Sequence, residues 1–339
     1  MDRFAADSYV YAKASGIYAR SFVGKRTPRL FEAKRLRDLW TTLFNDEVPL
    51  VPEGLLTLYL ERRAEQKAVD EFITLLSSYD TPDPLSKALL SFYDYNNLKA
   101  AVTAVITGEK DPPFMVDLKQ FSILDRTKWP DIAEMTKNGP LAWFNRVPKE
   151  AEHLAWENRL DHEYYRSVWR AFLQLSGKDR AATENLIREE IILQNIVWAM
   201  RLVSYYNTSA DEIESMLAGH DEPESTREIL CGPALSVLGR AFDSHADWTG
   251  WKYGWLLNPH EEGFPWTLDP RWAQLTADKY LFRTAMSLFH QNPFTVGVLV
   301  SFLKIKQLED QMIRVAAEGL RLGANETQLN EYVRDIFNA

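Results

Sequence analysis

Apolar residues recur along this chain at the spacing of one helix face, and this pattern constrains the fold more than any other. One stripe runs, at steps of three or four, through Ala88, Phe92, Tyr95, Leu98, Val102 and Val105. A second runs through Leu193, Ile196, Met200 and Val203, and a third through Val298, Phe302, Ile305, Leu308, Met312 and Val315. Alternating strand patterns bounded by hairpin turns are scarce, so the sequence predicts an all-α fold.

The length and an internal similarity predict more than one helical body. At 339 residues the chain exceeds the roughly 250 to 300 residues of a single core, so two or three subdomains are expected. Shifting the middle of the chain by 116 residues superposes Asn207 on Gly323. Asn and Gly both readily adopt the left-handed backbone conformation in which many helices end. Two residues after each comes a polar residue, Ser209 or Asn325, that can cap the start of the next helix. This ordered similarity indicates a repeated helical unit.

Proline- and glycine-rich segments mark the expected boundaries. They define a first helical subdomain at 1–112, a connecting segment at 113–149, a second subdomain at 150–233, a Trp-rich connecting segment at 234–270 and a third subdomain at 271–339. Five tryptophans lie between Trp248 and Trp272. Two interpretations stay open: the segment packs as an ordered loop on its own body, or some of its rings anchor a partner.

Charge is unevenly distributed. The chain carries a net charge of −9, which repels nucleic acid, although the first 40 residues hold nine Lys or Arg against four acids. This basic region is either a solvated helix face or a contact surface for an acidic partner. Arg29, Lys34 and Arg35 are the candidate contacts in the second case.

The compartment follows from cysteine usage and hydropathy. Cys231 is the only cysteine, so no internal disulfide or cysteine-based metal cluster can form, which fits a reducing cytoplasm. The N-terminal residues lack the apolar run of a secretory signal. The longest apolar stretch, Phe294 to Leu303, has ten residues, about half of what a spanning helix needs. Any membrane association is therefore expected through protein partners.

Motifs for catalysis are missing from the sequence. Neither a phosphate-binding glycine loop nor a nucleophile elbow occurs. Glu150 and His153 have the spacing of a di-metal carboxylate site, with Glu157 and Asp161 nearby. The same spacing also describes a charged outer face, so a helical metalloprotein is one alternative and a chain without metal or cofactor the other.

Four blocks carry a family resemblance. They are YVYAKASGIYARSFV from Tyr9, YDYNNLKAAV from Tyr93, LDHEYYRSV from Leu160 and the block from Asn292 to Leu320. Together they resemble the C-type central-stalk component of V/A-type rotary ATPases, which is known as the d-type component in eukaryotic vacuolar enzymes. The positions that match the family pattern are Asn97, Leu98, Lys99, Asn195, Pro293, Lys306, Glu309 and Arg314.

The resemblance implies a funnel-shaped protein of three related helical bundles in a pseudo-threefold arrangement. It implies a non-catalytic socket, without cofactor, that couples the central shaft to the membrane proteolipid ring for proton or sodium transport. The protein would lie on the cytoplasmic face of the membrane, in a hetero-complex rather than a homo-oligomer. A different class stays open: a helical adaptor that uses the basic region or the tryptophans to hold soluble partners outside any ATPase.

Overall fold

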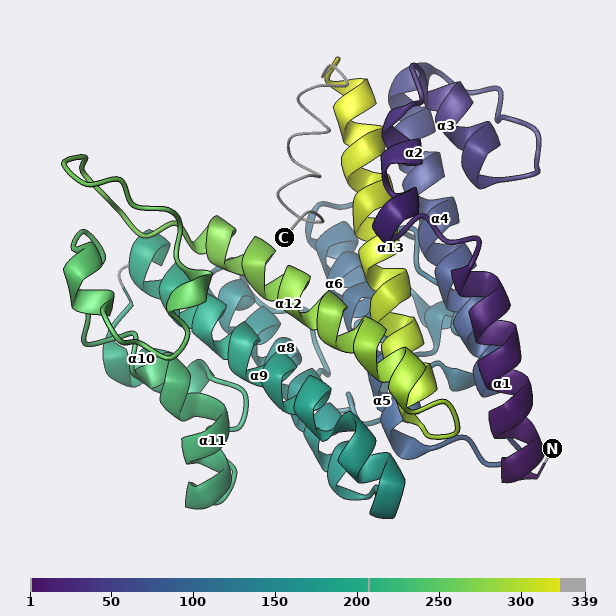
Figure 1. Ribbon diagram of the computed structural model, residues 1–339. Coiled ribbons are helices and arrows are strands. Elements are labelled where there is room, and N and C mark those ends of the chain that lie inside the picture. The colour runs from purple at the N-terminus through teal and green to yellow at the C-terminus, as the bar shows by residue number, and fades with distance from the viewer. Residues whose placement is uncertain (1, 207, 324–339) are drawn as a thin grey trace. The chain divides into compact units, whose positions relative to one another are not determined.

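The computed structural model describes residues 2–206 and 208–323, and every regular element among them is a helix (Figure 1). The all-α prediction is confirmed. Among the helices described, none combines the length and the apolar run that a membrane crossing would need. Gly323 has the expected positive φ of 71°, and Ser209 caps its helix as expected. Asn207 and Asn325 lie outside the described residues.

The chain divides into two compact units. Unit 1 comprises residues 1–149 and 285–339, and unit 2 comprises residues 150–284. The subdivision into three related subdomains with their connecting segments, and the pseudo-threefold arrangement, stay predictions.

Unit 1 is built around two long helices that lie side by side, α4 and α13 (Figure 1). Its helices are α1 (Arg3–Tyr18), α2 (Pro28–Phe31), α3 (Leu36–Leu43), α4 (Glu53–Leu76), α5 (Pro84–Leu90), α6 (Phe92–Ile106), α7 (Ile132–Thr136) and α13 (Gly297–Arg321). Short 3-10 turns at Gly24–Arg26, Lys119–Phe121 and Arg126–Lys128 join them. Asp2, Asp83 and Asp131 cap α1, α5 and α7 by accepting backbone N–H groups.

The stripe expected on α13 forms the core contact of unit 1. Phe302 and Met312 are completely buried on it, and Val298 and Leu308 nearly so. Each such side chain contributes about 1.5 to 3 kcal/mol when fully buried. The α4 face that meets them is also apolar, with Leu60 inaccessible to solvent. Helix α13 is therefore held in unit 1 chiefly by apolar burial.

The first predicted stripe, in contrast, spans two helices rather than one. Ala88 lies in α5, whereas Phe92 begins α6, and Ser91 stands between them. The Ser91 hydroxyl donates to the Ala88 carbonyl oxygen at 2.6 Å. The break is local, since the Ser91 N–H still donates to the Lys87 carbonyl oxygen and the Tyr95 N–H to the Ser91 carbonyl oxygen, both at 3.1 Å. The apolar periodicity continues across it because both helices bury one face.

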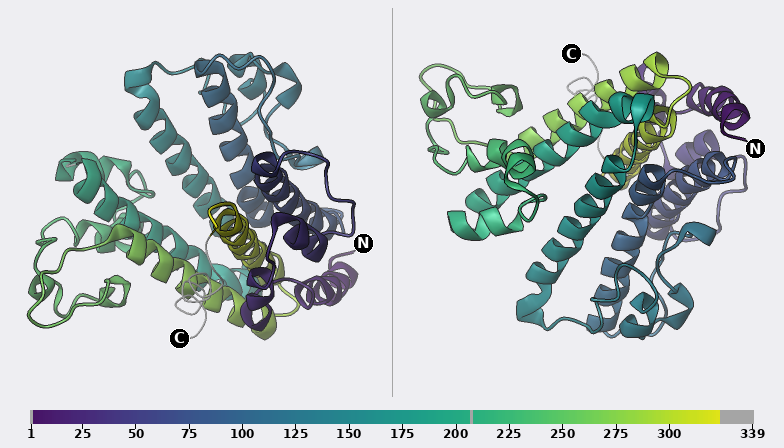
Figure 2. Two further views of the ribbon diagram at one scale, coloured as in Figure 1. Left: turned by 90° about the horizontal axis from the view of Figure 1, so that it is seen from above. Right: turned by 90° about the horizontal axis from the view of Figure 1, so that it is seen from below.

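Unit 2 contains a bundle of longer helices and a loop-rich segment. Its helices are α8 (His153–Leu173), α9 (Gly177–Tyr206), α10 (Ala210–Met216), α11 (Glu224–Leu235) and α12 (Pro270–Gln291), whose last residues belong to unit 1. Helix α11 packs against α9, on which Leu193, Ile196 and Met200 are buried as the stripe predicts. The light-green segment between α11 and α12 consists of loops and the 3-10 turns His245–Trp248 and Gly254–Leu256 (Figure 2).

Candidate functional site

A charged cluster interrupts the apolar contact between α4 and α13. Lys306 and Glu309 lie one turn apart on α13 and expose only 4% and 6% of their surface. Charged side chains are seldom so buried unless they are paired. Both belong to the family-pattern positions, and the structure brings them together.

Lys306 pairs with carboxylates from two helices. Its Nζ lies 2.7 Å from Glu71 Oε2 on α4 and also contacts Glu309 Oε2 on its own helix. Glu309 Oε1 accepts the backbone N–H of Phe22 at 2.7 Å, and Lys306 Nζ reaches Ser21 Oγ at 3.5 Å. Burial alone would lower the pKa of the Lys306 ammonium, but the two carboxylates outweigh burial and raise it. The cluster thereby joins α4, α13 and the loop after α1.

A second ionic group lies two turns further along α13. Arg314 Nε donates to Asp310 at 2.8 Å, and its terminal nitrogens lie 3.0 Å from Glu65 and 3.9 Å from Glu61. Burial raises the pKa of all three carboxyl groups, against the opposing effect of Arg314. Three carboxylates thus share one guanidinium, which satisfies their charge only in part.

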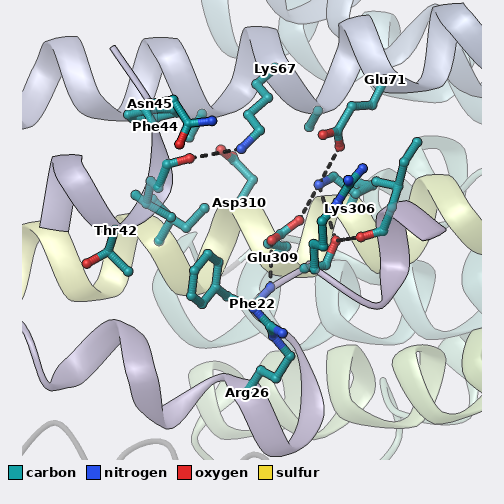
Figure 3. Close-up of a pocket in the computed structure, with 17 residues that line it drawn as sticks. Phe22, Arg26, Thr42, Phe44, Asn45, Lys67, Glu71, Lys306, Glu309 and Asp310 are labelled. Carbon is teal, nitrogen blue, oxygen red and sulfur yellow. Dashed lines mark hydrogen bonds and ion pairs between the residues drawn. The ribbon is translucent and has the colours of Figure 1, made fainter. Parts of the chain in front are cut away.

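A cavity of about 520 Å³ opens beside Lys306, Glu309 and Asp310 (Figure 3). Its walls come from the end of α1, the segment 20–26, the segment 42–45, α4 and α13. Lys67 and Glu71 border it from α4, and Phe22 and Arg26 lie on the opposite side (Figure 3). We call this cavity the Lys306 pocket. It lies wholly within unit 1.

Three cations besides Lys306 line the Lys306 pocket. Arg26 donates to the Ala19 carbonyl oxygen at 3.1 Å, and its guanidinium lies 5.5 Å from the Phe22 ring centroid. Lys67 donates to the Leu43 carbonyl oxygen at 2.9 Å. Arg20 is exposed. Within the described residues, none of these three side chains forms an ion pair with a carboxylate.

Asn97 and Asn195 form the same local arrangement in the two units. The Asn97 side-chain amide accepts the Val116 N–H at 2.8 Å and donates to the Val116 carbonyl oxygen at 2.9 Å. Asn195 bonds Ala218 in the same way, at 2.8 and 2.9 Å, and donates at 2.9 Å to the Leu230 carbonyl oxygen as well. Each buried amide therefore ties a long helix to a later segment of the chain. Neither lies at the Lys306 pocket.

The other family-pattern positions are less buried, apart from Leu98. Leu98 is fully buried in α6, whereas Lys99 beside it is half-buried. Pro293 is half-buried in the turn before α13. These side chains do not line the Lys306 pocket.

The three basic candidates for partner contact are exposed on unit 1. Arg29 is on α2, and Lys34 and Arg35 precede α3. Arg35 forms a bidentate pair with Asp38, with N–O distances of 3.0 and 3.1 Å. That pair takes up part of the charge that a partner could use.

The suggested metal ligands are spread along α8 and the 3-10 turn before it. His153 Nδ1 lies 3.8 Å from Glu157 Oε1, a contact between adjacent turns of α8. Glu150 lies in the 3-10 turn before α8, and Asp161 lies one turn beyond Glu157. In the part of the chain that the structure describes, no three His, Cys, Asp or Glu side chains are grouped as a metal would need.

Most of the tryptophans pack inside unit 2. Trp248, Trp251 and Trp266 expose 2%, 8% and 6% of their surface, and Trp251 donates to Ser236 Oγ at 2.9 Å. Trp255 is 41% exposed, so it is the ring of this group most available to a partner. Cys231 is buried, and burial raises the pKa of its thiol to about 12, which makes it unreactive at neutral pH.

Sequence reasoning missed the acidic partners on α4 and, on α13, Asp310. Glu61 and Glu65 are one turn apart and pair with Arg314, whereas Glu71, further along α4, pairs with Lys306. Carboxylates repeated at helical spacing beside an apolar stripe were the available signal. Their pairing with α13 depends on contacts across some 235 residues of sequence, from Glu71 to Lys306, which no local pattern encodes.

Two comparisons relate the chain to known proteins. A protein of Treponema pallidum (strain Nichols), described as an uncharacterized protein, is 31% identical over 337 residues, and the match covers 98% of each chain. Residues 25–332 match the family described as ATP synthase (C/AC39) subunit. The resemblance inferred from the sequence blocks is thereby confirmed, and the chain belongs to the ATP synthase (C/AC39) subunit family.

Proposed function

We propose that this chain is a non-catalytic rotor subunit of a V/A-type rotary ATPase, where it acts as a socket between the central shaft and the membrane proteolipid ring. The observation that carries the proposal is the family match over residues 25–332, which includes the buried cluster on α4 and α13. In this role the subunit passes torque, in either direction, during proton or sodium transport.

The packing of unit 1 supports a mechanical role. A part that transmits torque must resist deformation, and close-packed helix interfaces have low compressibility. Helices α4 and α13 are joined both by apolar burial and by the paired charges around Lys306. The bond from Phe22 to Glu309 adds the loop after α1 to the same cluster. These contacts supply stiffness without any reacting group.

The proposed place is the cytoplasmic end of the ring, with protein partners holding the subunit there. Exposed cations on Arg29 and Lys34 would favour an acidic partner through long-range attraction. Such attraction weakens as salt screens it, so this part of the contact should depend on ionic strength.

Co-purification tests the proposal. The chain carries an affinity tag and is expressed with all other subunits of the host ATPase, and the membranes are dissolved in mild detergent. We expect the shaft and proteolipid subunits to elute with the tagged chain in fixed proportion. Elution without either of them, while the remaining ATPase assembles, would contradict the proposal. Stable capture of soluble proteins from cells lacking the ATPase would favour the adaptor interpretation.

A further inference from the structure

The 116-residue similarity in the sequence extends to the helix boundaries. Moved by 116 residues, α8 would occupy residues 269–289 and α9 residues 293–322. The structure has α12 at Pro270–Gln291 and α13 at Gly297–Arg321. In unit 2, α9 is followed by α10. The counterpart of α10 after α13 falls in the C-terminal segment, residues 324–339, which lies outside the described residues.

In unit 2, one buried amide on α9 holds the chain that follows α10. Asn195 is completely buried and exchanges two hydrogen bonds with the backbone of Ala218, at 2.8 and 2.9 Å. Asn97 binds the backbone of Val116 in the same way in unit 1. Buried backbone N–H and C=O groups each need a partner, so such an amide fixes the position of the segment that it binds. Gln311 is the counterpart of Asn195 on α13, and its longer side chain carries the same amide.

The start of α10 has an equivalent in the C-terminal segment. Ser209 caps α10 by accepting the Glu212 N–H, and the Glu212 carboxylate accepts the Ser209 N–H in return. Moved by 116 residues, this pair falls on Asn325 and Gln328. Asn is a preferred helix cap, and Gln can return the bond as Glu does. The C-terminal segment therefore carries the sequence signals with which α10 begins.

The buried positions of α10 and of the residue after it have equivalents as well. Ile213 and Leu217 are completely inaccessible to solvent in unit 2. Their counterparts, Leu329 and Val333, are apolar too and have the spacing of one helix face. Apolar side chains at this spacing are stabilised when they leave water and pack on another face. The C-terminal segment thus repeats both the polar and the apolar signals of the α10 stretch.

The chain after α13 can return to Gln311. Gly323 has a positive φ of 71°, the left-handed conformation with which many helices end and in which the chain leaves the helix axis. From Gln311 to the end of α13 at Arg321 the helix runs for about 15 Å, at about 1.5 Å per residue. The stretch from Gly323 to Arg334, coiled as a helix, would span about 16 Å. Arg334 therefore comes within reach of Gln311, at the same separation of 23 residues that the amide contact in unit 2 has.

We propose that the C-terminal segment runs back along α13 and that the Gln311 amide exchanges two hydrogen bonds with the backbone of Arg334. The occupant is the chain's own segment because that segment repeats the signals of the stretch that binds Asn195 in unit 2. The contact lies on the side of α13 away from the Lys306 pocket, to which this helix contributes Lys306 and Ile313. Gln311 is then a positioning residue that holds the end of the chain. This contact does not depend on the proposed function.

Hydrogen exchange of the purified full-length chain, followed by mass spectrometry, tests the docking. We expect the backbone amides of residues 329–335 to exchange about a hundredfold more slowly than in an unstructured peptide of the same sequence. Gln311→Met keeps the length of the side chain and removes the amide, so it should raise these exchange rates by about tenfold. Gln291→Met, at an exposed position of unit 1, is the matched control and should leave the rates unchanged. Thermal unfolding of both variants shows whether the fold is retained.

Photocrosslinking of the otherwise unchanged chain locates the contact independently of the Gln311 variant. A benzophenone-bearing amino acid replaces Val315, which lies one turn from Gln311 on the same side of α13. We expect an intramolecular crosslink to the C-terminal segment. The same crosslinker at Ser8, an exposed position of α1, is the positional control and should not capture that segment.

Three outcomes overturn the inference. The first is exchange of residues 329–335 at the unstructured rate in the wild type, and the second is protection that Gln311→Met leaves unchanged. The third is a crosslink from position 315 that reaches only another molecule, because a second copy or a partner subunit would then occupy this side of α13. None of these results bears on the proposed function, which co-purification with the ATPase tests separately.

Discussion

Replacing Lys306 by Met removes the cation that compensates two largely buried carboxylates. The Lys306 side chain is 5% exposed, that of Glu309 7% and that of Glu71 23%. Breaking a buried pair by removing one partner costs about 3 to 5 kcal/mol. Because Glu71 retains some solvent and Glu309 keeps the Phe22 N–H, we expect a loss near the lower value, about 3 kcal/mol of unfolding free energy.

The assay is urea unfolding of the purified chain at pH 7, followed by circular dichroism. A second variant carries Lys306→Met with Glu71→Gln and Glu309→Gln, which removes the charges together. We expect it to recover most of the loss, because replacing a whole buried ionic group is often neutral. Lys110→Met, at an exposed position, is the control and should change stability by less than about 0.5 kcal/mol.

The pH dependence gives an independent check on the same variant. In the native protein the pKa of Lys306 is raised above the ordinary 10.5, so its stabilisation is complete below pH 10.5 and is lost as pH rises through the folded pKa. In Lys306→Met the two carboxylates lack their cation, and protonation relieves them. The deficit should therefore shrink as pH falls from 7 to 4.5. A loss below about 1 kcal/mol at pH 7, or a triple variant as unstable as the single one, would refute the reasoning.

Three further predictions concern other parts of the chain. Asn195→Ala leaves the buried Ala218 N–H without its acceptor and should cost about 1 to 3 kcal/mol in urea unfolding, whereas Asn195→Asp at low pH should cost less. Burial raises the pKa of Glu65, so ionisation of this carboxyl group destabilises the native state as pH rises. The unfolding free energy of Glu65→Gln should therefore increase relative to that of the wild type between pH 4.5 and 7. A difference between the two unfolding free energies that does not change with pH would contradict this prediction. Neutralising Arg29, Lys34 and Arg35 together should weaken assembly more than folding, and an unchanged complex at moderate salt would remove this surface from the account.

Local periodicity was sufficient to predict the long helices. On α13 the stripe from Val298 to Met312 is buried as expected, because apolar residues at helical spacing have few alternatives to a packed helix. The same rule failed at Ser91, where α5 ends while the periodicity continues into α6. A break of one residue keeps the spacing of the apolar positions, so a stripe does not reveal it.

The candidate site was only half predictable. Lys306 and Glu309 stood out only because they match the family pattern, since the apolar stripe runs beside them through Ile305 and Leu308. Glu71 did not stand out, because its partner is far away in the sequence and acids are common on exposed helix faces. The pocket was equally hidden, since its walls come from five separate segments. Sequence patterns describe each helix but not which polar faces meet.

The central claim, that the chain couples shaft to ring, is tested most directly by electron cryomicroscopy of the purified host ATPase with the tagged chain bound. The account predicts that the chain lies on the rotation axis, in contact with the shaft on one side and the proteolipid ring on the other. Density for the chain at the catalytic head or along a stationary peripheral stalk would contradict it, as would a complete rotor that lacks the chain.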